Sequence, residues 1–154
     1  MTGFFDRNDR DGNVLIDFDK EAEFTGFYHQ DKRHGFGVFS SKDENFQGDF
    51  YEGLLEGYGR YWSTTSFYEG FWYEGKQDGY GIEIMFNSDC YIGEFKRGKK
   101  EGLGFYLFGK GGYYYGSFKN NERTEMGVLY NVNYACYYLG EFKGDVRSGR
   151  GLQV

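Results

Sequence analysis

The sequence predicts an all-β protein: one elongated, single-layer, twisted antiparallel meander of about seven β-hairpin repeats, with no separate globular core. Three observations support this fold class. An aromatic-x-Gly-x-aromatic pattern recurs every 22 to 24 residues, a Gly-x-Gly pair follows the opening aromatic by 11 and 13 residues in five repeats, and the chain has 26 glycines but no proline. A fixed period of this size is typical of repeat arrays. The absence of proline suits uninterrupted ladders of backbone hydrogen bonds.

The repeats open at residues 1, 24, 46, 68, 91, 114 and 138. Five of them carry the complete pattern. The repeat from residue 114 has Glu125 in place of the first glycine of the pair, and the repeat from residue 1 has Met1 in the aromatic position and Val14 in place of the second glycine. We therefore expect residues 1–154 to form a single array with a degenerate first repeat and a truncated last one.

Each repeat is predicted to contain two strands. In the repeat from residue 68, Tyr68, Gly70 and Trp72 share one face, because successive side chains of a strand point to opposite sides. The polar stretch 74–78 has the composition of a hairpin turn, and residues 79–84 form the second strand. A ring that lies across a glycine covers backbone without a side chain. We expect such rings to replace a second layer.

Charge is distributed unevenly along the chain. Residues 1–90 hold 18 acidic and 8 basic residues, a net charge of −10, whereas residues 91–154 hold 6 and 10, a net charge of +4. The acidic front half argues against a nucleic-acid partner, because phosphate binding needs basic surface. The uneven distribution of charge between the two halves is compatible with an oppositely charged protein partner or a homo-oligomer. The alternative is that the turn charges only solvate the sheet.

The two cysteines, Cys90 and Cys136, are predicted to be free thiols. They lie two repeats apart, which at ~4.8 Å per strand is roughly 19 Å, and a disulfide needs Cα atoms within about 7 Å. Free thiols fit a reducing, cytoplasmic compartment. The first 13 residues show no signal-peptide pattern, and no apolar run approaches the ~20 residues of a membrane-spanning helix.

The segments 68–81 and 91–104 resemble the MORN repeat (membrane occupation and recognition nexus), and the resemblance extends over essentially the whole chain. It implies a single twisted β sheet with a groove along one face. It also implies a non-catalytic scaffold in a cytoskeletal, ciliary or membrane-apposed assembly. The expected location is cytoplasmic, with the cytoskeleton or the cilium and its axoneme as candidate sites.

On this basis we expect a protein-interaction module that binds an extended or helical partner segment along the aromatic–glycine groove, within a larger complex. Large aromatic residues are frequent anchors at interfaces. The alternative is that these rings pack only on each other. The expected groove residues are Tyr28, Phe50, Trp72, Phe95, Phe118 and Phe142.

A second hypothesis is a peripheral membrane tether that binds anionic lipid through a basic turn. Glu94 and Glu101 flank this turn and the chain is acidic overall, so a membrane is not favoured. The candidate lipid-binding residues are Lys96, Arg97, Lys99 and Lys100.

Metal sites are also not favoured. Residues 9–21 resemble a calcium-binding EF-hand loop, but Val14 occupies the glycine position and Lys20 the position of the terminal acid. His29, Asp31 and His34 surround one predicted turn without an obvious fourth ligand. No cofactor is expected, and no nucleophile–base set is present, so the chain is not expected to be an enzyme.

The end of the last repeat gives a further expectation. Its second strand, residues 149–154, should be short and should lie at a sheet edge. Exposed strand edges invite pairing or need a cover. We therefore expect this repeat to be completed by something outside the monomer.

Overall fold

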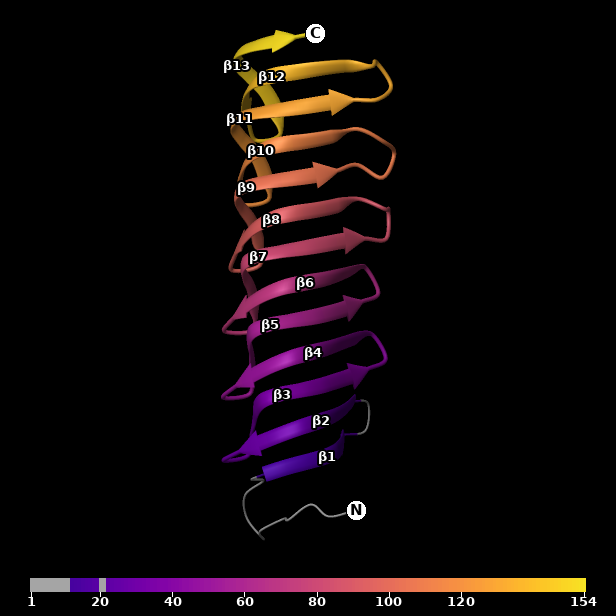
Figure 1. Cartoon of the computed structure of the whole chain (residues 1–154), viewed down its shortest axis with the longest axis vertical. Helices are drawn as coiled ribbons and strands as arrows, with labels where there is room; N and C mark the ends of the chain where they lie inside the picture. Colours follow the sequence, from indigo (N-terminus) through magenta and orange to yellow (C-terminus); the bar gives the residue numbers. More distant parts are fainter. Residues whose placement is uncertain (1–11, 20–21) are drawn as a thin grey trace. The chain divides into compact units, whose positions relative to one another are not determined.

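The computed structural model describes residues 12–19 and 22–154 (Figure 1). The chain divides into an N-terminal unit, residues 1–76, and a C-terminal unit, residues 77–154. Each unit is an antiparallel meander in which consecutive strands pair, and the described ranges contain no helix. No helix long and apolar enough to cross a membrane occurs in this part of the chain. The all-β meander is therefore confirmed within each unit. A single array over residues 1–154 stays a prediction.

The strands follow one another in chain order. From β2 onward the connections within the N-terminal unit have two residues each, whereas in the C-terminal unit two-residue turns alternate with connections of four or five residues. The N-terminal unit contains β1 (Gly12–Asp19), β2 (Ala22–His29), β3 (Lys32–Ser41), β4 (Glu44–Tyr51), β5 (Leu54–Ser63) and β6 (Ser66–Tyr73). The C-terminal unit contains β7 (Lys76–Met85), β8 (Cys90–Lys96), β9 (Lys99–Leu107), β10 (Tyr113–Lys119), β11 (Glu122–Asn131), β12 (Cys136–Lys143) and β13 (Val146–Gln153).

Every hairpin within a unit has the same register. The glycine of the first strand lies opposite the second glycine of the Gly-x-Gly pair, as in Gly93 opposite Gly104 and Gly116 opposite Gly127. Directly after this glycine pair the register shifts, which marks a β-bulge in the second strand. The repeat length is therefore set by a turn, a bulge and a glycine pair that recur together.

The first glycine of each Gly-x-Gly pair sits in the bulge. Gly35 and Gly102 have φ angles of 62° and 65°, in the left-handed region that favours glycine. Glu125 occupies the equivalent position in the repeat from residue 114 and adopts the same conformation, with φ 54°. The bulge therefore persists where the sequence pattern is broken, at the cost of a strained non-glycine residue.

The tight turns are shorter than the sequence predicted. Residues 74–78 were expected to form one turn, but the turn consists only of Glu74 and Gly75, and Lys76 already belongs to β7. Both turn residues have positive φ, 49° and 75°. Such two-residue turns match the twist of the flanking strands. The turn can be tight because the residues of the second strand that have no partner on the first strand lie in the bulge rather than in a longer loop.

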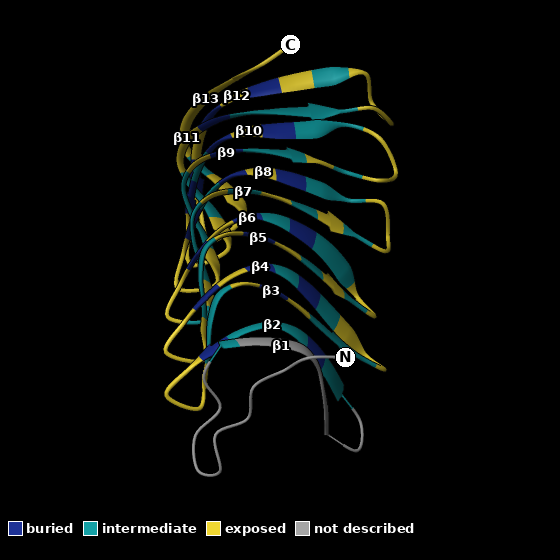
Figure 2. Ribbon diagram, turned by 60° about the horizontal axis from the view of Figure 1, so that its bottom comes forward, coloured by how far each residue is buried: buried dark blue, intermediate teal, exposed yellow. Residues whose placement is uncertain are grey.

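Each sheet buries one face, which we call the inner face, and exposes the other, which we call the outer face. In β6, Tyr68, Gly70 and Trp72 are buried, while Phe71 and Tyr73 are exposed. This alternation confirms the predicted faces. The strands of each unit are arched, and exposed turns join them at their ends (Figure 2). The buried aromatic residues of the two units are Phe24, Tyr28, Phe46, Phe50, Tyr68, Trp72, Tyr91, Phe95, Tyr114, Phe118, Tyr138 and Phe142.

The second strand of the last repeat is longer than expected. β13 begins at Val146 rather than at Gly149, and it pairs with β12 up to the contact of Tyr138 with Gln153. Beyond it, Tyr137 and Val154 exchange two backbone hydrogen bonds, of 2.8 and 3.0 Å. The expectation of a short strand was therefore wrong. Completion of this repeat by another molecule stays a prediction.

Candidate functional site

A continuous stripe of edge-to-face rings fills the inner face of each unit. In the C-terminal unit, the centroid of the Tyr91 ring lies 5.1 Å from that of Phe95 and 5.0 Å from that of Phe118. Tyr114 lies between Phe118 and Phe142 in the same way, at 5.2 and 5.1 Å. The N-terminal unit has the same zigzag through Tyr28, Phe24, Phe50, Phe46, Trp72 and Tyr68. Aromatic pairs favour this geometry.

The glycine pairs make room for these rings. A Cβ placed on Gly93 would lie 2.5 Å from the hydroxyl oxygen of Tyr91, and one on Gly104 would lie 2.4 Å from a ring carbon of Tyr91, closer than real Cβ contacts. The phenol of Tyr91 also donates a hydrogen bond of 2.9 Å to the carbonyl of Glu94, next to the bulge. The predicted coverage of glycine by aromatic rings is therefore confirmed. The Tyr91 ring comes from the same strand as Gly93, and it also covers Gly104 on the paired strand.

The six predicted groove residues all belong to this stripe. Their exposed fractions are 4% for Tyr28, 3% for Phe50, 8% for Trp72, 4% for Phe95, 4% for Phe118 and 3% for Phe142. The rings contact one another edge to face and are nearly fully buried. Partner binding by these residues stays a prediction, and the surface open to a partner has to be found among the side chains beside them.

Cationic side chains cover several of the rings. The guanidinium carbon of Arg123 lies 5.6 Å from the Tyr114 ring and 5.5 Å from the Phe142 ring, distances of cation–π contact. Arg123 also donates to the Asp145 carboxylate at 2.9 Å. Arg33 and Arg147 lie over rings at the same repeat position. This cationic row was not predicted, although its constant offset of nine residues from the opening aromatic is visible in the sequence.

The four candidate lipid-binding residues do not share one surface. Lys96, Arg97 and Lys99 are exposed at the turn between β8 and β9. The Lys100 amine instead lies on the inner face, 2.6 Å from the Glu83 carboxylate and 5.2 Å from the Tyr91 ring. Its side chain is only 13% exposed. A lipid head group could therefore meet three of these cations, but not Lys100.

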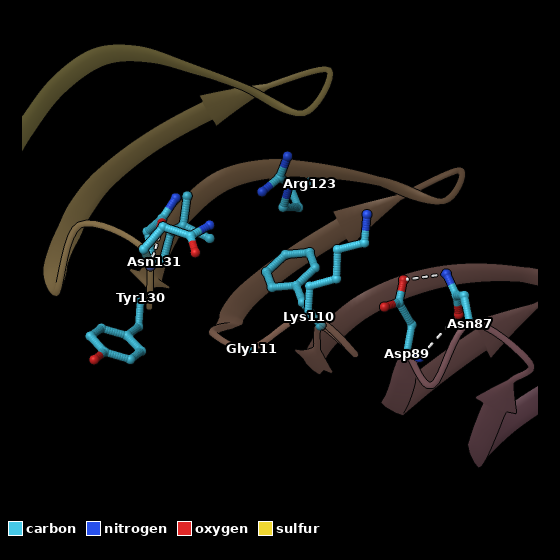
Figure 3. Close-up of a pocket in the computed structure, with 10 residues that line it drawn as sticks. Asn87, Asp89, Lys110, Gly111, Arg123, Tyr130 and Asn131 are labelled. Carbon is cyan, nitrogen blue, oxygen red and sulfur yellow. Dashed lines mark hydrogen bonds between the residues drawn. The ribbon is translucent and has the colours of Figure 1, made fainter.

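An open pocket of about 430 Å³ lies beside the ring stripe in the C-terminal unit (Figure 3). Its walls come largely from the wider connections, residues 86–89, 108–112 and 132–135, which exceed the two-residue connections 42–43 and 64–65 of the N-terminal unit. A second pocket of about 270 Å³ shares Phe108 and Arg123 with it. The lining residues are Asn87, Asp89, Phe108, Lys110, Gly111, Arg123, Leu129, Tyr130, Asn131 and Asn133.

Asp89 fixes one wall of this pocket. Its carboxylate accepts hydrogen bonds from the backbone N–H of Gly109 at 2.7 Å, from the Tyr106 phenol at 2.6 Å and from the Asn87 amide at 2.9 Å. Burial by itself raises the pKa of Asp89, but these three bonds outweigh it and lower the pKa below the ordinary value. Burial and the bond to Asp89 raise the pKa of Tyr106. At neutral pH the wall therefore holds a stable carboxylate–phenol bond.

Lys110 is the cation of the pocket that stays available to bind a ligand or partner. Its amine has no hydrogen bond or ion pair with any residue in the described ranges, whereas Arg123 is held by Asp145. Three asparagine side chains line the same pocket beside the apolar Phe108 and Leu129. The arrangement offers one cation, amide donors and acceptors, and an apolar floor. No part of it was predicted from the sequence.

The structure also places the metal and thiol candidates. The rings of His29 and His34 lie 5.7 Å apart, edge to face. Within residues 12–19 and 22–154, no group of three or more His, Cys, Asp or Glu side chains is suited to hold a metal ion. Residues 9–11, 20 and 21 of the calcium-loop-like segment lie outside the described residues. Cys90 and Cys136 are free thiols, and burial raises the pKa of Cys90.

Comparison with known proteins identifies the repeat. A search of curated proteins gave no match. The family model of the MORN repeat matches residues 24–45, 46–66, 68–90, 91–113, 114–135 and 138–154. These segments cover well over half of the chain and begin at the same positions as the repeats from residue 24 onward. The chain therefore belongs to the MORN repeat family.

Proposed function

We propose that this chain is a non-catalytic interaction module that holds a segment of a partner protein on the inner face of its C-terminal unit. MORN repeats are in general modules for interaction with proteins or membranes. The observation that carries the proposal is the open pocket beside the closed ring stripe, with Lys110 as an unpaired cation. A cytoskeletal, ciliary or other large assembly is the setting that the family suggests.

The lining of the pocket defines what the partner segment offers. Phe108 and Leu129 favour an apolar side chain, and Lys110 favours an acidic one. The asparagine side chains can form hydrogen bonds with the backbone of an extended segment. The segment is therefore an extended peptide that carries an apolar residue near an acidic one.

The test is affinity capture with the whole chain, followed by mass spectrometry and by direct titration of the captured partner. Wild type is compared with Lys110→Glu, which reverses the one available charge of the pocket. Lys119→Glu is the matched control, because this lysine is exposed on the outer side of β10. We expect Lys110→Glu to weaken binding about tenfold or more. Equal binding by both variants and wild type would rule out the pocket.

A second candidate function is the membrane tether. It is favoured by the exposed cations Lys96, Arg97 and Lys99, and by Lys119 and Lys143 at equivalent strand ends of the same unit. Each basic residue near an anionic surface contributes roughly 1 kcal/mol. Flotation with anionic and neutral vesicles separates the two functions. Flotation that depends on anionic lipid and is lost in Lys96→Glu/Lys119→Glu would favour the tether.

A further inference from the structure

The outer face of the C-terminal unit carries two rows of side chains without a single charge. The rows run across the strands, and each member pairs in register with the next. Row A consists of Ile82, Ile92, Phe105, Tyr115, Val128, Leu139 and Leu152. Row B consists of Ile84, Cys90, Leu107, Tyr113, Tyr130, Tyr137 and Val154.

The N-terminal unit shows that the fold does not require apolar residues at these positions. Its outer face has the same register, but most of the side chains are polar or charged. The residues equivalent to row A are Thr25, Val38, Gln47, Arg60 and Glu69. The residues equivalent to row B are Glu23, Ser40, Asn45, Trp62 and Phe67. Folding of a repeat therefore does not explain why these positions are apolar in the C-terminal unit.

The rows expose a large apolar area. Nine of their members are exposed large hydrophobic residues, with exposed fractions such as 48% for Ile92, 49% for Leu139 and 62% for Leu152. At about half exposure of side chains of roughly 150 Å² each, the nine expose on the order of 700 Å². The largest apolar patch of an ordinary monomer is about 300–600 Å². A standard interface buries about 800 Å² on each partner, so this face has the area of one half of an interface.

We propose that rows A and B of one chain pack on rows A and B of a second copy, sheet against sheet. In a two-fold contact a surface meets itself, and a charged residue at the two-fold axis would face its own copy and hence a like charge. Rows A and B contain none. A partner chosen by charge would find nothing to pair with here. Sheet faces covered by branched and aromatic side chains pack face to face about 10 Å apart. This contact uses the outer face, whereas Arg123 and Leu129 of the proposed partner pocket lie on the inner face; Tyr130 is common to the pocket and row B.

Cys90 provides a reporter inside the contact. It lies in row B between Ile84 and Leu107, whereas Cys136 alternates with Tyr137 along β12 and therefore faces the inner side. In a Cys136→Ser background, the rate of maleimide modification measures access to Cys90 alone. We expect the rate to fall as the protein concentration rises, because dimerisation covers row B.

The test combines this rate with sedimentation equilibrium of the whole chain over a wide concentration range. We expect a monomer–dimer equilibrium in wild type. The double variant Ile92→Thr/Leu139→Thr keeps strand-forming residues but removes apolar area from row A, and should raise the dissociation constant about 100-fold or more. Val38→Thr, at the equivalent position of the N-terminal unit, is the matched control and should leave the dimer intact. Circular dichroism establishes that each variant is folded.

Three results would overturn the proposal. The first is a wild-type chain that stays monomeric at every concentration. The second is a dimer that persists in the double variant with Cys90 equally accessible throughout, which would place the contact elsewhere. The third is a monomeric chain that binds neutral phosphatidylcholine vesicles through these rows, which would make a lipid surface the occupant.

Discussion

The ring of Tyr91 lies directly over the backbone of Gly104, so that a Cβ on this glycine would stand 2.4 Å from the ring carbon Cε2 and 2.5 Å from the phenol oxygen. The same relationship holds for Tyr114 over Gly127 and for Tyr138 over Gly151. The ring and the glycine therefore form one packing unit. Neither can change without the other, and this explains why both recur with the repeat.

Gly104→Ala should consequently destabilise the protein by about 2–3 kcal/mol, the usual magnitude for overpacking a tight core position. Urea denaturation measures the loss. Tyr91→Ala is expected to be destabilising by itself, but Gly104→Ala added to it should cost far less than in wild type. Such coupling is the signature of two residues in contact. Additive effects of the two substitutions would contradict the packing unit.

Glu125→Gly should stabilise the chain by about 1 kcal/mol, because it relieves the left-handed strain of a residue with a side chain. The increase is smaller than the full strain, since glycine also raises the entropy of the unfolded chain. Gly102→Ala, at the equivalent bulge of the preceding repeat, is the reciprocal control and should destabilise by a similar amount. The midpoints of urea unfolding decide the sign of both. A destabilising Glu125→Gly would mean that the carboxylate makes a needed contact.

Alkaline pH should unfold the protein through its inner-face phenols. Burial and a hydrogen bond to Glu44 raise the pKa of Tyr61 to about 12, and burial raises the pKa of Tyr114 to about 12. The neutral phenol is thus favoured in the folded state. The associated stability is complete below about pH 10, the ordinary tyrosine pKa, and is lost as the pH rises through about 12. Urea midpoints between these values should fall. Tyr61→Phe/Tyr114→Phe should flatten the decline, whereas Tyr134→Phe, at an exposed tyrosine, should not.

The pair of Glu83 and Lys100 should be far more sensitive to a single substitution than a surface pair. Its side chains are 17% and 13% exposed, and its atoms lie 2.6 Å apart. Glu83→Gln leaves a poorly solvated amine and should cost about 3 kcal/mol. Replacement of both residues, by Glu83→Leu/Lys100→Met, should recover much of this loss. Glu69→Gln, in the exposed pair with Arg60, should change stability by less than about 1 kcal/mol. Similar losses in both pairs would contradict this difference in burial.

The repeat pattern could be predicted well because its causes are local. Alternation along a strand assigned Tyr68, Gly70 and Trp72 to one face, and the spacing of aromatics and glycines identified the hairpins. The length of the turns was harder to predict from the sequence. Lys76 appeared to belong to a polar turn because composition does not reveal a bulge, and only the bulge permits a two-residue turn at Glu74 and Gly75.

The candidate sites could be predicted only in part. Trp72 and its equivalents were correctly assigned to the ring face, but the sequence does not say that each ring would be covered by its neighbours. The basic turn was predicted as one cluster, yet Lys100 follows the strand alternation to the inner face, while Lys96 stays outside. The pocket around Lys110 depends on three connections that are distant in the sequence and converge only in the folded unit.

The sequence alone therefore determined the β class, the repeat boundaries and the two faces of each strand, because a period of two and a fixed repeat length follow from backbone geometry. Only the tertiary structure decided which surface remains open. Burial depends on what neighbouring repeats place against a side chain. The strand pattern assigns Phe118 and Tyr115 to opposite faces of β10, but it does not say which of these aromatic faces is closed and which stays open. Their different exposure arises from the stacking of repeats within the unit, which closes the inner face with rings and leaves rows A and B uncovered.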